Sequence, residues 1–254
     1  MSGHPAVTAT VFTHRGAVRE GNEDAFVVGA LTAAGVEMSE PATCVLPVRR
    51  PLVVAVADGL GGHAAGEVAS EHAVRRLAEA GESLDGPQAI GEVLGGIDDE
   101  LRRYAAAHPT HAGMATTIAG LTFAPDGVYW FNVGDSRAYR ITGDGLRQIS
   151  VDDSPPVPGA EPGTPEAVTN IVTQTLGGAS AVDMTPHIER EDDEATAWLL
   201  CSDGLSDLVP ADTIAKVLRD EASDAAALRT LWAAAMNASG RDNITIVLAR
   251  KTTV

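Results

Sequence analysis

The sequence has 254 residues, of which 44% are apolar, and this is enough to bury a sizeable core. Its 35 acidic and 18 basic residues give a formal charge of −17, which argues against nucleic acid or an anionic membrane as the main partner. Because an apolar leader and an apolar run of about 18 residues are both absent, we expect a cytoplasmic protein without membrane insertion. We also expect one domain over 1–254, with Cys44 and Cys201 as free thiols.

In chain order, apolar runs and alternation predict short strands, and helical spacing predicts longer helices. The predicted strands are residues 6–12, 25–28, 52–57, 116–123, 128–133, 138–141, 146–149, 169–176, 187–189, 195–202 and 243–249. The predicted helices start near residues 66, 87, 210 and 223. Residues 32–50 are predicted to be an irregular loop, and the five prolines between 155 and 165 predict an exposed excursion.

The stretch LVVAVADGLGGHAAG, residues 52–66, is the centre of the sequence. Its apolar run predicts a strand buried on both faces, and Asp58 stands at the end of that strand. A lone buried carboxylate is costly unless a cation or hydrogen bonds offset its burial. Gly59 and the glycines that follow let the backbone approach a ligand closely, and His63 lies on the same turn. A plain strand, turn and helix cap is the alternative for this stretch alone.

Three further aspartates occupy similar positions at strand ends. Asp135 and Asp203 follow apolar runs, and Asp242 immediately precedes the last predicted strand. By contrast, Asp126 and Asp144 each lie between two strands, where a hairpin turn explains them. Aspartate oxygens that converge without cysteine favour hard cations such as Mg²⁺ or Mn²⁺.

Two such ions can share a carboxylate and hold a water between them, which is an arrangement used to hydrolyse phosphate esters. The planar guanidinium of Arg19 suits two phosphate oxygens. His63 could protonate the leaving group, because the ordinary pKa of histidine is about 6.5. From these residues alone a metal phosphoesterase and a structural cation-binding or regulatory module both stay open, and Arg19, Glu23 and Asp24 could equally form a solvated turn.

Five sequence blocks resemble the bacterial form of the type 2C (PPM) metal-dependent serine/threonine protein phosphatases. They are REGNED at 19–24, VADGLGGHAAGEVAS, NVGDSRAY, LLCSDGLSDLV and SGRDNITIVL, in the family's order. The resemblance implies an α+β fold, a four-layer α/β/β/α sandwich whose two central antiparallel sheets are flanked by helices. It also implies a flap at about 151–174.

The resemblance further implies a metal centre that holds two core Mn²⁺ or Mg²⁺ ions and a weaker third. Asp58 would bridge the core ions, with the Gly59 carbonyl facing the second, and Asp203 and Asp242 would complete the first. The other matching acidic positions are Glu23 and Asp24 near the second ion and Asp135, together with Asp203, at the third.

The implied reaction is hydrolysis of phosphoserine or phosphothreonine by direct attack of metal-activated water. Arg19 would bind the phosphate and His63 would be the general acid. Phosphorylated proteins would be the substrates, and a serine/threonine protein kinase would oppose the enzyme. A phosphatase for a small-molecule phosphate or for one dedicated protein is the alternative within the enzyme class, and a binding-only pseudophosphatase is the alternative outside it.

The chain departs from the family pattern at four places. Ala115-Thr116-Thr117 replaces the usual Gly-Thr-Thr, and Asp152-Asp153-Ser154 replaces Asp-His-Ser. Gln174 stands where relatives often have Arg, and the flap is rich in proline. These departures leave the metal set intact, so we expect an active enzyme with an atypical substrate preference.

Overall fold

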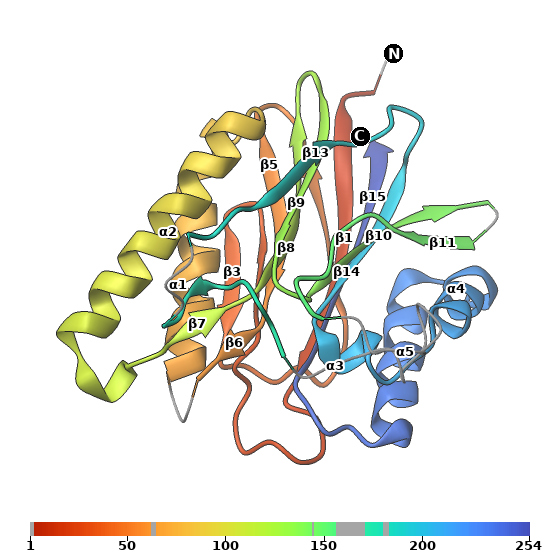
Figure 1. Ribbon diagram of the computed structural model, residues 1–254. Helices are drawn as coiled ribbons and strands as arrows, with labels where there is room; N and C mark the ends of the chain where they lie inside the picture. The colour runs from red at the N-terminus through yellow and green to blue at the C-terminus, as the bar shows by residue number, and fades with distance from the viewer. Residues whose placement is uncertain (1–2, 62–64, 144, 156–170, 180–182) are drawn as a thin grey trace.

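The computed structural model describes residues 3–61, 65–143, 145–155, 171–179 and 183–254. Two β-sheets stack face to face, and helices cover the outer face of each (Figure 1). Helices α1 (Ala65–Ala80) and α2 (Pro87–Ala107) cover one sheet. Helices α3 (Asp203–Ser206), α4 (Ala211–Asp220) and α5 (Asp224–Ala238) cover the other. The predicted α+β class and four-layer sandwich are confirmed.

Both large sheets are antiparallel. The sheet beneath α1 and α2 runs in the order β13 (His187–Arg190), β9 (Gly127–Val133), β8 (Ile118–Ala124), β5 (Leu52–Ala57), β2 (Ala25–Val28) and β3 (Leu31–Ala34). The other runs in the order β11 (Gly145–Gln148), β10 (Arg137–Thr142), β14 (Ala197–Cys201), β15 (Ile244–Thr253), β1 (Pro5–His14) and β4 (Ala42–Pro47). A small sheet joins β12 (Leu176–Gly177), β7 (Ala115–Thr116) and β6 (Gly59–Leu60).

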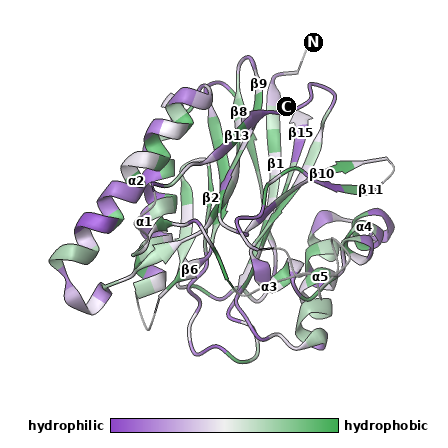
Figure 2. Ribbon diagram, in the orientation of Figure 1, coloured by the Kyte–Doolittle hydropathy of each residue, from purple (hydrophilic) through white to green (hydrophobic). Residues whose placement is uncertain are grey.

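The continuous apolar run of β5 follows from its place between two cores. Val53 and Ala55 pack against α1 and α2, whereas Val54 and Val56 pack between the sheets. In Figure 2 hydrophobic residues predominate in the central strands, whereas hydrophilic residues are prominent on α2 and α4. A strand buried on both faces has no polar positions to alternate with apolar ones.

The prediction of an irregular loop over 32–50 was wrong, because this region contains β3 and β4. β4 pairs with β1 at the edge of its sheet, so its side chains are mostly exposed or half-buried and carry little apolar periodicity. The strand predicted over 169–176 is also not found among its described residues, which are irregular until β12 begins at Leu176. The single strand predicted over 116–123 is divided at Thr117, whose backbone N–H donates to the Asp58 carbonyl.

Within the described ranges, no helix is both long and apolar enough to cross a membrane. Cys44 and Cys201 are free thiols, as predicted, and Cys201 is buried in β14.

Candidate metal centre

Asp58 lies at the end of β5, where the acidic residues of the site converge. Burial, followed by the charges of the neighbouring aspartates, raises the pKa of Asp58 well above its ordinary value. Those neighbours are Asp24, Asp203, Asp242 and Asp135. The fold therefore brings together five aspartates that are widely separated in the sequence.

Two threonines at the junction of β7 and β8 hold the backbone around Asp58. Thr116 Oγ1 and the Thr117 N–H both donate to the Asp58 carbonyl, at 2.8 and 2.9 Å. The Asp58 N–H in turn donates to Thr117 Oγ1 at 3.2 Å. Ala115 precedes these threonines, so replacing the family's usual glycine there leaves this support in place.

Gly59 fits where no side chain could. A Cβ at this position would collide with the backbone of Gly66, at the start of α1, and would lie 2.6 Å from the Glu23 carbonyl. Glu23 is fixed from two sides: its N–H donates to Asn243 Oδ1 at 2.8 Å, and its carbonyl accepts from Ser70 Oγ at 2.5 Å. Three separate segments therefore meet around Gly59.

Asp24 is the most deeply buried acid of the site. Burial raises its pKa to about 7, while a hydrogen bond from Ser202 Oγ at 2.7 Å acts in the opposite direction. Ser202 also accepts from the Thr245 N–H at 3.0 Å, so it links Asp24 to β15. The other carboxylate oxygen of Asp24 is buried and has no hydrogen-bond partner among the described residues. The sequence reasoning did not predict a role for Ser202, although its position directly before Asp203 is a signal that could have indicated one.

Asp203 begins α3, directly after the buried strand β14. Burial and then the charge of Asp207 raise the pKa of Asp203 to about 7. Asp207 lies one helical turn later, at the end of α3, and burial raises its own pKa to about 6. Asp207 is a residue that the sequence reasoning missed, although the spacing of four from Asp203 places both on one helical face.

Arg19 and Asp242 come from opposite ends of the chain and meet at the site. Arg19 donates to Asp242 Oδ2 at 2.7 Å, and the charges of Asp58 and Glu23 also act on the guanidinium. Asn243 fixes the loop that carries Arg19, because its side-chain amide donates to the carbonyls of Arg15 and Gly21, at 2.9 Å each. Its N–H also donates to Asp242 Oδ1 at 2.9 Å, so Asn243 connects the Arg19 loop to Asp242.

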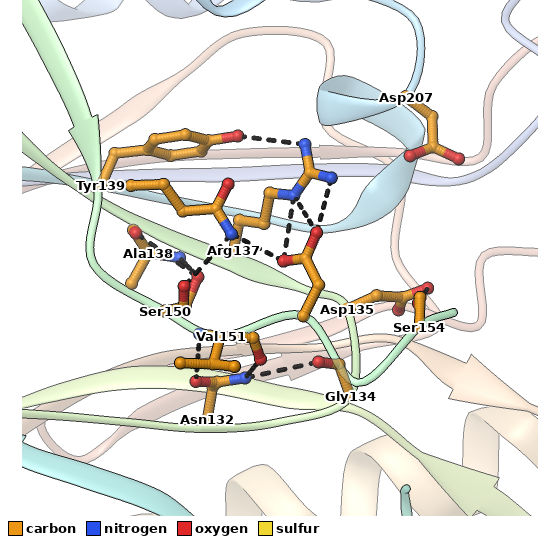
Figure 3. Close-up of polar contacts among 12 residues, drawn as sticks. Asn132, Gly134, Asp135, Arg137, Ala138, Tyr139, Ser150, Val151, Ser154 and Asp207 are labelled. Atoms are coloured by element: carbon orange, nitrogen blue, oxygen red, sulfur yellow. Dashed lines mark hydrogen bonds and ion pairs between the residues drawn. The ribbon is translucent and has the colours of Figure 1, made fainter. Parts of the chain in front are cut away.

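Asp135 approaches the cluster from the end of β9. Burial, followed by the charge of Asp203, raises its pKa to about 7. Ser154 Oγ donates to Asp135 at 3.4 Å, and the two side chains lie next to each other in Figure 3. Asp207 faces this region from α3, and the nearby Arg137 guanidinium acts to lower the pKa of both acids.

The fold thus brings Asp58, Asp203, Asp242, Asp135 and Asp24 together and places Glu23 and Arg19 beside them. The predicted general acid His63 lies outside the described residues, as does most of the predicted flap, 156–170.

The acidic cluster fits a cation. Asp24 and Asp203 each keep a buried carboxylate oxygen without a hydrogen-bond partner among the described residues. Burial, and then the charges of neighbouring aspartates, raise the pKa of both groups, and a bound cation would offset both effects. Within the described ranges, no three acidic, histidine or cysteine side chains already stand at metal-ligand spacing.

Comparison with known proteins identifies the family. The profile of the protein phosphatase 2C family matches residues 42–249. The serine/threonine protein phosphatase PstP of Mycobacterium tuberculosis is 32% identical over 251 residues, which is 92% of this chain and 43% of PstP. The serine/threonine phosphatase stp of Listeria innocua is 31% identical over 217 residues, covering 80% of this chain and 85% of stp.

A solved structure of the PstP catalytic domain in complex with two manganese ions superposes with a TM-score of 0.72 at 27% identity, covering 98% of this chain and 99% of that one. The chain therefore belongs to the protein phosphatase 2C family. It spans less than half the length of PstP.

Proposed function

We propose that this chain is a serine/threonine protein phosphatase, which hydrolyses phosphoserine and phosphothreonine in proteins with Mn²⁺ or Mg²⁺ as cofactor. One observation carries the proposal: the Arg19 guanidinium donates to Asp242 Oδ2 at 2.7 Å, within the cluster of buried aspartates around Asp58. Family membership and the manganese ions of PstP support the same reading.

Asp58, Asp203 and Asp242 are the proposed ligands of the core ions, together with the Gly59 carbonyl. Glu23 and Asp24 are proposed to lie near the second ion, and Asp135 together with Asp203 is proposed to hold a weaker third ion. We add Asp207 to this third site, because its charge acts on Asp203 and the charge of Asp135 acts on Asp207. When bound, such ions supply an activated water and neutralise the phosphate. Arg19 binds phosphate oxygens through its planar guanidinium, which orients the ester for attack. His63 is the proposed proton donor to the leaving hydroxyl.

A serine/threonine protein kinase would produce the substrates of this activity. The proposed unit is a single catalytic domain over 1–254, and the proposed compartment is the cytoplasm.

Phosphate release from a phosphothreonine peptide tests this function. The purified protein is assayed with Mn²⁺ and then with excess EDTA, beside the variants Asp58→Asn and Asp203→Asn. We expect release that requires Mn²⁺ and falls by at least about a hundredfold in either variant, because each loses a charged ligand.

Asp99→Asn is the matched control, since Asp99 is exposed on α2 and outside the cluster. Full activity in Asp58→Asn, or activity that resists EDTA, would contradict the proposal. Release from small phosphoesters but from no phosphopeptide would favour a small-molecule phosphatase. Binding of a phosphopeptide without release would favour a pseudophosphatase.

A further inference from the structure

The buried carboxylate of Asp153 joins three segments that lie far apart in the sequence. Its side chain is only 7% exposed. One carboxylate oxygen accepts from the Gly134 N–H at 2.9 Å. The other accepts from Gln174 Nε2 at 2.8 Å and from His187 Nε2 at 2.9 Å. Both oxygens are therefore satisfied, which a buried carboxylate requires.

The backbone of Asp153 repeats these connections. Its N–H donates to the Gly134 carbonyl at 3.0 Å, and its own carbonyl accepts from the N–H and Oγ1 of Thr173, at 2.7 and 2.9 Å. Residues 153 and 173, which are 20 positions apart, are thus fixed to each other and to the end of β9.

Two of the four departures from the family pattern meet in this cluster. Asp153 replaces the usual histidine and Gln174 the usual arginine, and here they are hydrogen-bonded to each other. Gln174 Oε1 also accepts from the Thr185 N–H at 2.9 Å, which fixes the amide. The remaining donor is His187, which β13 holds beside Asn132 of β9. These two departures are therefore one structural feature, in which Asp153 is paired with Gln174 and with His187.

This feature acts on the residue next to Asp135. Gly134 has a φ of +97°, and a Cβ there would lie 2.7 Å from the Thr117 side chain. The turn therefore requires glycine at this position. Asp153 bonds both backbone polar groups of Gly134. The following residue, Ser154, donates to the Asp135 carboxylate itself. Residues 153 and 154 consequently hold Gly134 and Asp135 as a pair.

We propose that Asp153, fixed by Gln174 and His187, is a positioning residue for the Asp135 carboxylate and so for the weakest of the three cation sites. The inference rests on the proposed function for its catalytic consequence, but its effect on cation binding stands alone. A ligand that is already held in place loses little freedom on binding a cation, and groups that orient ligands typically change affinity by about 10- to 100-fold.

Mn²⁺ binding and turnover together test this role in the variants Asp153→Ala, His187→Ala and His187→Gln. Free Mn²⁺ is measured by electron paramagnetic resonance during titration, and kcat and KM are measured with p-nitrophenyl phosphate. We expect Asp153→Ala and His187→Ala to weaken only the weakest Mn²⁺ site, by about tenfold, and to lower kcat more than they change KM. Glutamine can place an amide donor near the position of His187 Nε2, so His187→Gln should restore most of the binding.

His72→Ala is the matched control, because His72 Nε2 lies 2.7 Å from Glu100 in a histidine–carboxylate pair on the outer helices. Folded Asp153→Ala and His187→Ala proteins that bind every Mn²⁺ ion as the wild type does would overturn the inference. Equal weakening of all sites would overturn it too, since that indicates general loss of structure. If Asp153→Ala does not fold, the contrast between His187→Ala and His187→Gln decides. If the wild-type protein binds Mn²⁺ but releases no phosphate, only the proposed function is overturned. The inference about Asp153 is still tested, because the titrations report on the weakest site.

Discussion

The Arg19 guanidinium donates a 2.7 Å hydrogen bond to the Asp242 carboxylate across 223 positions of sequence. The contact brings the proposed phosphate ligand and a proposed metal ligand into one site. Asn243 donates to two carbonyls of the loop around Arg19, and these hydrogen bonds hold the guanidinium near the carboxylates.

Arg19→Ala should lower kcat/KM for a phosphopeptide by about 10- to 100-fold, since hydrogen bonds to charged groups contribute about 1.5–3 kcal/mol. Arg19→Lys should recover only part of the loss, because an ammonium lacks the planar two-donor geometry. Steady-state kinetics with Mn²⁺ measures both. Arg15→Ala is the control: Arg15 lies in the same loop but pairs with Glu37. An Arg15→Ala loss as large as that of Arg19→Ala would contradict a specific role.

The metal-free protein should be less stable at about pH 7.5 than at about pH 5.5. Asp24, Asp135 and Asp203 have pKa values raised to about 7, so between about pH 4 and 7 the folded state binds more protons than the unfolded state. The free energy of unfolding therefore falls as pH rises through this window. Thermal unfolding in EDTA at the two pH values measures the difference, and Mn²⁺ should raise the midpoint most at the higher pH.

Asp24→Asn supplies the control for that experiment, because the amide cannot ionise. This variant should show a smaller loss of stability between the two pH values than the wild type. A wild-type midpoint that rises from the lower to the higher pH in EDTA would show that the buried acids do not govern this dependence.

Asp207→Asn should have effects of opposite sign on stability and on function. Asp207 is the leading charged neighbour that raises the pKa of Asp203. Removing its charge should raise the unfolding midpoint in EDTA at about pH 7.5, and it should also increase the Mn²⁺ concentration needed for half-maximal activity. Asp99→Asn should change neither quantity. A variant that is both less stable without metal and equally active would contradict this role.

Two glycine-to-alanine changes should have opposite effects on stability. At Gly204 a Cβ would collide with the Asn243 carbonyl, so alanine should separate the turns that carry Asp203 and Asp242. We expect Gly204→Ala to cost about 1–3 kcal/mol and most of the activity. At Gly95, on α2, a Cβ meets nothing within 4 Å, so alanine should stabilise the helix by about 0.5–1 kcal/mol. Urea unfolding measures both, and a Gly204→Ala protein with wild-type stability would contradict the close approach.

The sequence by itself determined the elements with strong periodicity and the acids at their ends. The run before Asp58 has a single good solution, a strand buried on both faces, because apolar side chains on both sides must be removed from water. The same reasoning identified Asp203 and Asp135, and the motifs that contain them resemble those of the family.

Only the tertiary structure decided the features that depend on contacts between residues distant in the sequence. β4 forms because β1 offers it an edge, and an exposed edge strand needs no apolar periodicity. The bond between Asp153 and Gln174, and the convergence of Asp24 with Ser202, arise from segments folded against each other. Local residue patterns report which face of an element is buried, but hydrogen bonds between distant segments exist only once the layers have packed.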